Sequence, residues 1–154
     1  MVEINFPSLV GLFALGTAVT IIVLYVFFSK SEKKFTSVEI NGVKVNAEVA
    51  DNFVKKSAGL MNRESLGKND GMLFVFASED YHKFWMKNMM IPLDFIWISG
   101  NKTIVDITEN VQPCISGCPN FTSQEKAQYV LEVNAGFAKE NKIKVGEKVN
   151  FVIS

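Results

Sequence analysis

The stretch VEINGVKVNAEV at residues 38–49 decides the fold class. Apolar and polar residues alternate on both sides of Asn41 and Gly42, so each flanking segment has the period of a half-buried strand. Asn-Gly favours the two-residue turn of a β-hairpin, because both central positions of that turn require a positive φ. We therefore predict a β-hairpin over this stretch.

Downstream of the hairpin, the sequence indicates short strands and two short helices. Asp51 is the expected N-cap of a helix that ends near Ala58, with Gly59 in a left-handed conformation after it. A second short helix is expected at residues 136–142. Strands are predicted at residues 72–76, 84–87, 94–99, 103–108, 129–133 and 148–153, with a turn at Gly100 and Asn101.

These elements define a β-rich α+β fold. Six to seven short strands lie close together along the chain, so antiparallel pairing is expected for most of them. About 120 residues are available to fold, which is enough for one core. The pattern predicts a curled or partly closed, barrel-like sheet with two short helices.

Composition and motifs exclude several classes of function. The 154 residues include 16 Lys+Arg and 16 Asp+Glu, so the chain lacks the basic excess that nucleic-acid binding requires. Neither GxGxxG nor GxxxxGK[ST] occurs, and the single histidine, His82, is interpreted as a surface imidazole. We expect no nucleic-acid partner, no cofactor and no metal site.

Residues 7–28, PSLVGLFALGTAVTIIVLYVFF, contain no charged side chain. As a helix they would extend about 33 Å, which matches a hydrocarbon core of about 30 Å. We predict a transmembrane anchor here, after a tail at 1–6 and before a linker at 29–34, with a soluble domain at 35–154. A cleaved signal peptide is the alternative, but the stretch is longer than such peptides need and lacks a basic start.

The orientation of this anchor is set by two opposing signals. Lys30, Lys33 and Lys34 follow the span, and the positive-inside rule would place the domain in the cytoplasm. Cys114 and Cys118 lie in the turn-rich PCISGCP loop, where a small disulfide ring is the natural interpretation. A disulfide indicates an oxidising compartment outside the cytoplasmic membrane. Free thiols, metal binding and redox chemistry remain alternatives for the two cysteines.

The richest group of polar side chains lies in and around FWMKNMMIPLD at residues 84–94. If residues 84–88 form a strand, Asn88 shares the apolar face with Phe84, while Trp85 points to the other face. An amide on an apolar face needs a partner, and Asp94 could supply it. This pair could fix a bend in a strand or could bind a ligand.

Two further charged side chains are candidates for the same site. Glu132 is the one charge in the apolar run YVLEV, so it either lines a groove or lies on an exposed sheet face. Arg63, in the loop after Gly59, could pair with such an acid, or could simply be solvated.

The chain resembles the DUF192 (UPF0127) family. The resemblance covers about 100 residues and is carried by four ordered blocks: GLMNRESL at 59–66, GMLFVF at 71–76, FWMKNMMIPLDFIWI at 84–98, and YVLEVNAG with a later KVGEKV at 129–149. It implies a small β-rich α+β domain, commonly exported or membrane-anchored. On this ground we predict that the domain is extracytoplasmic.

The resemblance names a fold but leaves the activity open, because the family has none established. By position, its recurring polar residues are similar to Arg63, Asn88, Asp94 and Glu132 here. The chain departs from the pattern in two places. It has KKSA at 55–58 where the family often has an Arg upstream of GLM, and it has Met89 where a Thr follows the Asn. The lost hydroxyl argues against a catalytic role for that segment.

Three functions are compatible with these residues. The favoured one is a membrane-anchored module that binds a polar cell-envelope component, such as a glycan or a peptide, through Arg63, Trp85, Asn88, Asp94 and Glu132. A hydrolase could use Asp94 and Glu132 as a carboxylate pair, provided that both face one cleft. A structural subunit of a membrane complex would dock another protein through a strand edge or apolar surface.

Overall fold

The computed structural model of the protein describes residues 33–153. The predicted tail at 1–6, the anchor at 7–28 and the first part of the linker therefore lie outside the described residues. Within the described part, no helix is long and apolar enough to cross a membrane. Residues Lys33–Ser154 form one compact unit.

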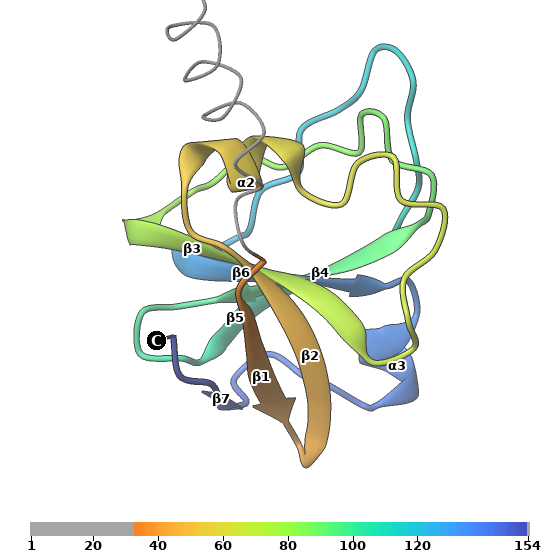
Figure 1. Ribbon diagram of the computed structural model, residues 1–154. Helices are drawn as coiled ribbons and strands as arrows, with labels where there is room; N and C mark the ends of the chain where they lie inside the picture. The colour runs from red at the N-terminus through yellow and green to blue at the C-terminus, as the bar shows by residue number, and fades with distance from the viewer. Residues whose placement is uncertain (1–32, 154) are drawn as a thin grey trace, which may run out of the picture. The chain divides into compact units, whose positions relative to one another are not determined.

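Within residues 33–153, seven strands form one curled sheet, with two short helices beside it (Figure 1). The order of strands across the sheet is β5-β4-β6-β3-β2-β1-β7. This confirms the predicted β-rich α+β fold. In chain order the elements are β1 (Phe35–Ile40), β2 (Val43–Ala50), α2 (Phe53–Ala58), β3 (Asp70–Asp80), β4 (Leu93–Ile98), β5 (Ile104–Val111), β6 (Ala127–Asn134), α3 (Phe137–Glu140) and β7 (Val149–Asn150).

The predicted hairpin is confirmed as β1 and β2. The two strands pair antiparallel, and Ile40 lies opposite Val43 across the turn. Asn41 and Gly42 both have positive φ values, 52° and 79°, as the two-residue turn requires. Val38 and Val45, which lie opposite each other, are both buried, so the alternation in the sequence marks the inner face correctly.

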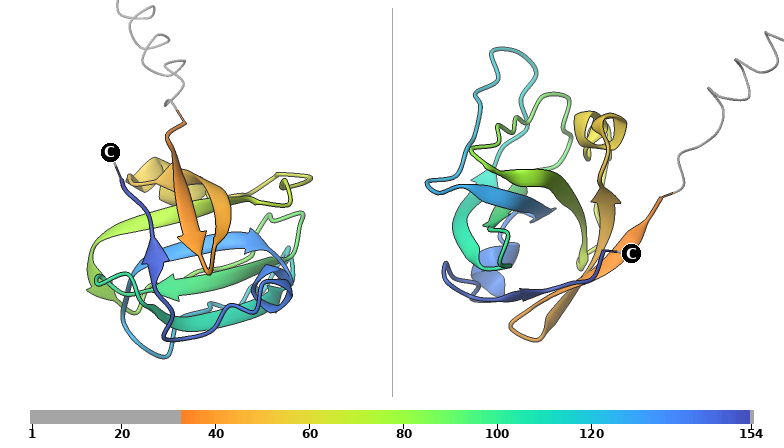
Figure 2. Two further views of the ribbon diagram at one scale, coloured as in Figure 1. Left: turned by 90° about the horizontal axis from the view of Figure 1, so that it is seen from below. Right: turned by 90° about the vertical axis from the view of Figure 1, so that its left-hand side faces the viewer.

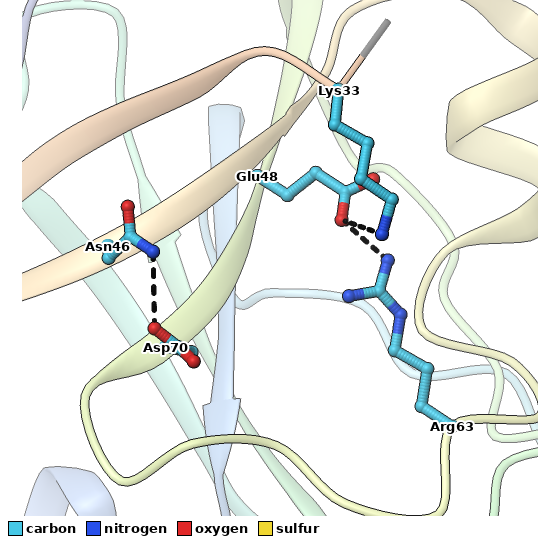
Figure 3. A network of polar contacts seen from close by, with 5 residues as sticks. All are labelled: Lys33, Asn46, Glu48, Arg63 and Asp70. Atoms are coloured by element: carbon cyan, nitrogen blue, oxygen red, sulfur yellow. Dashed lines mark hydrogen bonds and ion pairs between the residues drawn. The ribbon is translucent and has the colours of Figure 1, made fainter. Parts of the chain in front are cut away.

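The pair β2 and β3 is the exception to antiparallel pairing. These strands are parallel, with Val49 opposite Leu73 and Asn46 opposite Asp70. The intervening chain contains α2 and a loop, which return it to the end of the sheet where β2 started. The Asn46 side-chain amide donates to Asp70 Oδ1 at 3.2 Å and fixes the start of β3 (Figure 3).

The curl of the sheet brings its two edge strands together (Figure 2). β7 pairs with β1, where Val149 lies opposite Ile40. An isolated β-bridge joins Thr103, which directly precedes β5, to Lys148, which directly precedes β7. The predicted closing strand at 148–153 is shortened to two residues, because Phe151 presents its carbonyl to the Lys102 ammonium at 2.7 Å rather than to a strand.

The sheet separates two apolar cores. The inner core receives residues from all seven strands and is enclosed by the curl. The outer core lies against β2 to β6 and is covered by the loops at residues 81–92 and 112–126. All six residues of β4 are buried because this strand has a core on each side, which explains its nearly continuous apolar sequence.

The predicted strand at residues 84–87 is wrong. This segment makes only two isolated bridges, Phe84 to Phe121 and Lys87 to Cys114. Side-chain alternation still holds, because Phe84 and Met86 are buried while Trp85 is exposed. The segment has no continuous partner strand, so its apolar side chains pack on the outer core without forming a ladder.

The helix caps differ slightly from those expected. Asn52, not Asp51, is the N-cap of α2, and its side-chain oxygen accepts from the Lys55 amide at 3.0 Å. Asp51 instead forms an ion pair with the Lys55 ammonium at 3.6 Å. Gly59 ends α2 with a positive φ of 49°, but its ψ of −139° lies outside the left-handed helical region that was expected. The helix α3 covers only part of the expected 136–142 helix.

Candidate functional site

A row of side chains crosses the outer face of the sheet. Glu48 on β2 lies opposite Met72 on β3, Met72 lies opposite Glu132 on β6, and Glu132 lies opposite Phe95 on β4. Residues that are directly opposite in neighbouring strands project to the same face. The two glutamates therefore share one face and are separated by a single strand.

Glu132 is the most unusual ionisable group among the described residues. Its side chain is buried, with a residue exposure of 4%, and its Oε2 has no hydrogen-bond partner in this part of the chain. Burial raises the pKa of Glu132 to about 8, although the nearby positive charge of Arg63 acts in the opposite direction. At neutral pH this carboxyl is therefore mostly protonated and can donate a hydrogen bond.

Glu132 lines an apolar cleft of about 340 Å³ beside α2. The size is in the range of sites that take one small molecule or one side chain. Trp85 and Phe53 lie at the cleft and are largely exposed, whereas Phe74 and Leu60 are buried in its wall. The lining residues are Phe53, Lys56, Ser57, Ala58, Gly59, Leu60, Met61, Phe74, Phe76, Lys83, Phe84, Trp85, Met89 and Glu132.

Two cations surround the carboxylate of Glu48 (Figure 3). Glu48 Oε2 lies 2.6 Å from Arg63 Nη2 and 3.3 Å from Lys33 Nζ. Burial alone would raise the pKa of Glu48, but the hydrogen bond and charge of Arg63, with help from Lys33, hold it below its usual range. Two glutamates on the same face therefore have opposite protonation states at neutral pH, which is a recurrent property of functional sites.

Aromatic rings and cations form the side of the cleft near the end of β3. Phe76 stacks on His82 with ring centroids 3.5 Å apart, and Lys56 Nζ lies 4.8 Å from the Phe76 ring. His82 is thus partly buried, not a free surface imidazole as expected, and this burial lowers its pKa. The imidazole is therefore neutral at physiological pH and serves as a packing surface.

Asp94 is located on the other face of the sheet. It lies opposite Val133, whereas Glu132 lies opposite Phe95, so the two carboxyl groups project to different sides. Asp94 is fully buried and accepts three backbone amides: Asn110 at 2.8 Å, Gly136 at 3.0 Å and Ala138 at 3.0 Å. It joins β4, the end of β5 and the start of α3, which is a structural role.

The predicted position of Asn88 is also wrong. Its side chain is exposed, because the residue has φ 59° and turns the chain away from the outer core. Its backbone holds two loops together instead: Asn88 donates to the Cys114 carbonyl at 3.2 Å, and its own carbonyl accepts from Asn62 at 3.0 Å. Asn88 and Asp94 therefore do not form the buried pair that alternation suggested.

Of the predicted site residues, the structure brings three together. Glu132 and Trp85 line the cleft, and Arg63 lies close enough to influence the charge of Glu132. Glu48 was missed, although it carries the same signal as Glu132: it is one charge in the apolar run AEVA at residues 47–50. A search of every strand for a lone charge among apolar residues would have identified both glutamates.

Cys114 and Cys118 form a disulfide, as predicted, with Cα atoms 5.6 Å apart. The bridge closes the loop that Asn88 holds through its backbone. Among residues 33–153, no group of three or more His, Cys, Asp or Glu side chains is arranged to hold a metal ion.

Solved structures share this fold. A protein of Sinorhizobium meliloti 1021, described only provisionally as a transcription regulator, is 30% identical with a TM-score of 0.68, over 78% of this chain and 94% of its own. A protein of unknown function from Novosphingobium aromaticivorans is also 30% identical with a TM-score of 0.68, over 80% of this chain and 88% of its own. Both chains contain little besides the domain described above.

Two curated relatives are proteins of Pyrococcus species. A UPF0127 protein of Pyrococcus abyssi is 31% identical over 110 residues, which are 68% of this chain and 85% of the relative. A UPF0127 protein of Pyrococcus furiosus is 24% identical over 114 residues, 71% of this chain and 89% of the relative. The DUF192 family, an uncharacterized ACR family, matches residues 36–151. The four quoted blocks, the curled sheet and this match agree: the chain belongs to the DUF192 (UPF0127) family.

Proposed function

We propose that the chain is a membrane-anchored, extracytoplasmic module that binds a peptide of the cell envelope through the cleft at Glu132. The observation that carries this proposal is a buried carboxyl in an apolar cleft, whose Oε2 has no hydrogen-bond partner among residues 33–153. A buried polar group without a partner costs free energy, so it is kept where a ligand can supply the missing contact.

The lining of the cleft favours a peptide over a glycan. A sugar ring presents several hydroxyl groups, and each loses a hydrogen bond unless the site supplies a polar partner. The wall is formed by Leu60, Phe74, Phe84 and other apolar side chains. An aromatic or aliphatic side chain suits this wall, and the neutral Glu132 can donate to a peptide carbonyl.

Two lysine side chains are among the residues that line the cleft. Lys83 and Lys56 line the cleft, and the Lys56 ammonium is held by the Val75 carbonyl at 3.1 Å. Two cations near an aromatic wall favour a peptide that carries an acidic group beside its apolar side chain. Trp85, half exposed, would cover one side of the bound segment.

Binding can be tested with N-acetyl-phenylalanine amide as the probe and N-acetylglucosamine as the comparison. We expect saturable changes in Trp85 fluorescence with the first probe and none with the second. Glu132→Leu should weaken binding about tenfold, because it keeps the apolar contact and removes the donor. The matched control is Glu147→Leu, which removes a partly exposed carboxyl group in the turn before β7, away from the cleft lining. Binding of the sugar alone, or equal binding by both variants, would contradict the proposal.

The proposed location can be tested through the disulfide. Both cysteines lie in an exposed loop, so they are accessible to reagents once reduced. In intact cells that express the full-length chain, an impermeant thiol reagent applied after reduction should label Cys114 and Cys118. The Cys114→Ser/Cys118→Ser variant is the control. Labelling only after the cells are opened would place the domain in the cytoplasm, as the lysine count suggests.

The hydrolase alternative is excluded in its carboxylate-pair form. That mechanism needs Asp94 and Glu132 across one cleft, but they lie on opposite faces of the sheet. Asp94 is also fully occupied by three backbone amides. The cleft that we propose as the binding site is therefore lined by Glu132 and Trp85, with the charge of Arg63 nearby and without Asp94.

A further inference from the structure

Large apolar side chains are exposed at one end of the domain. Phe53 and Val54 on α2 are 82% and 71% exposed, and no residue of α2 is buried. Trp85, Met90 and Ile115 are exposed on the two loops that Asn88 links. Figure 2 shows α2 and these loops at the same end of the sheet. We call these five residues the apolar tip.

Lysines surround the apolar tip. Lys83 and Lys87 flank Trp85 and are exposed, with Lys87 Nζ 5.9 Å from the Trp85 ring. Lys55 and Lys56 belong to α2, where their ammonium groups already contact Asp51 and the Val75 carbonyl. Exposed apolar side chains within a group of cations match an interface between headgroups and acyl chains, where the rings enter the apolar region and the ammonium groups meet phosphates.

The start of the domain lies at the same end. The Lys34 carbonyl accepts from the Val49 amide at 2.7 Å, and the Lys33 ammonium is 3.3 Å from Glu48. The chain continues from Glu48 along the end of β2 into α2, which begins at Phe53. The domain therefore begins beside the helix that carries the two most exposed residues of the tip.

The length of the preceding chain determines what can reach the tip. Only residues 29–32 separate the apolar stretch at 7–28 from Lys33. Even fully extended, this connection spans at most about 18 Å. A bilayer that holds residues 7–28 would thus lie within reach of α2.

We propose that the apolar tip docks on the lipid bilayer, so that the cleft lies next to the membrane surface. This inference rests on the anchoring part of the proposed function. It adds a second membrane contact, made by the folded domain itself, and it restricts the ligand of the cleft to segments close to the membrane.

The test uses the isolated domain, residues 33–154, so that the anchor cannot contribute. This part is a compact unit, and the solved relatives consist almost entirely of the same domain. The probe is a vesicle of phosphatidylcholine mixed with phosphatidylglycerol. We expect the domain to sediment with the vesicles and the emission of Trp85 to shift to shorter wavelength, whereas the fully buried Trp97 should not respond.

Substitutions of exposed residues show which surface of the domain binds the vesicles. Phe53→Asp/Val54→Asp should lower vesicle binding at least about tenfold. Val145→Asp should leave it unchanged: Val145 is 58% exposed, but it lies next to Glu147, which accepts from Asn41 at the opposite end of the hairpin. All three substitutions are exposed, so the thermal unfolding temperature should not change.

Two outcomes would overturn the docking proposal. One is an unmodified domain that does not bind vesicles, and the other is an equal loss of binding in the Phe53/Val54 and Val145 variants. Co-purification of the full-length chain with a protein subunit through Phe53 and Val54, without vesicle binding, would show that the tip docks a protein. Membrane extraction of the full-length chain tests the anchor separately, because it depends on residues 7–28.

Discussion

Asp94→Ala is expected to lower the free energy of unfolding of the domain by about 4 kcal/mol. The carboxylate is fully buried and accepts the amides of Asn110, Gly136 and Ala138. Alanine would leave these buried donors without a partner, and each such donor costs about 1 to 3 kcal/mol. Because typical domains are stable by about 5–15 kcal/mol, this single change would remove a large part of the total.

Urea unfolding of the isolated domain measures this effect. Asp94→Asn keeps one oxygen acceptor and should lose less stability than the alanine variant. Glu147→Ala is the matched control, because Glu147 also accepts a backbone amide, from Lys144 at 2.9 Å, but this hydrogen bond is exposed to solvent and its loss should cost less than about 1 kcal/mol. Equal losses in the two alanine variants would show that Asp94 does not hold β4, β5 and α3 together.

Glu132→Gln is expected to make the domain more stable than the unmodified protein at alkaline pH, by on the order of 5 kcal/mol. The pKa of Glu132 is raised from 4.5 to about 8 by burial. An acid whose pKa is raised on folding binds its proton more tightly in the folded state, so stability falls as pH increases from 4.5 to about 8. Glutamine cannot ionise and removes this loss.

The measurement is the difference in unfolding free energy between the two proteins over this pH range. The difference should grow with pH up to about 8 and then become constant. Any free-energy cost of burying the glutamine amide is independent of pH, so it shifts the difference in unfolding free energy by the same amount at every pH. The lowered pKa of Glu48 contributes stability that is lost on acidification, and it is common to both proteins. A pH-independent difference would mean that Glu132 is ionised in the folded state.

About half of the candidate site could be predicted from the sequence. Glu132, a single charge inside an apolar strand, was expected either to line a groove or to lie on an exposed sheet face, and the structure shows that it is buried and lines the cleft. Asn88 was placed incorrectly because alternation assumes a regular strand, and the positive φ of Asn88 breaks the alternation. Asp94 was predicted to be the partner of the Asn88 amide, but its partners are the backbone amides of Asn110, Gly136 and Ala138, all more than ten residues away.

The sequence by itself determined the features that depend on neighbouring residues. The Asn41-Gly42 turn, the burial of alternate residues in the hairpin and the bridge between Cys114 and Cys118 each need only a few consecutive positions. Their geometry is fixed by local φ preferences and by short loop closure, which act in the same way in any fold.

Only the tertiary structure decided which distant residues meet. The parallel pairing of β2 with β3, the contact of Arg63 with Glu48 and the opposite faces of Asp94 and Glu132 all depend on strand order and register. A shift of register by one residue moves a side chain to the other face, and no local propensity fixes that choice. It follows from burying two apolar cores on the two sides of one curled sheet.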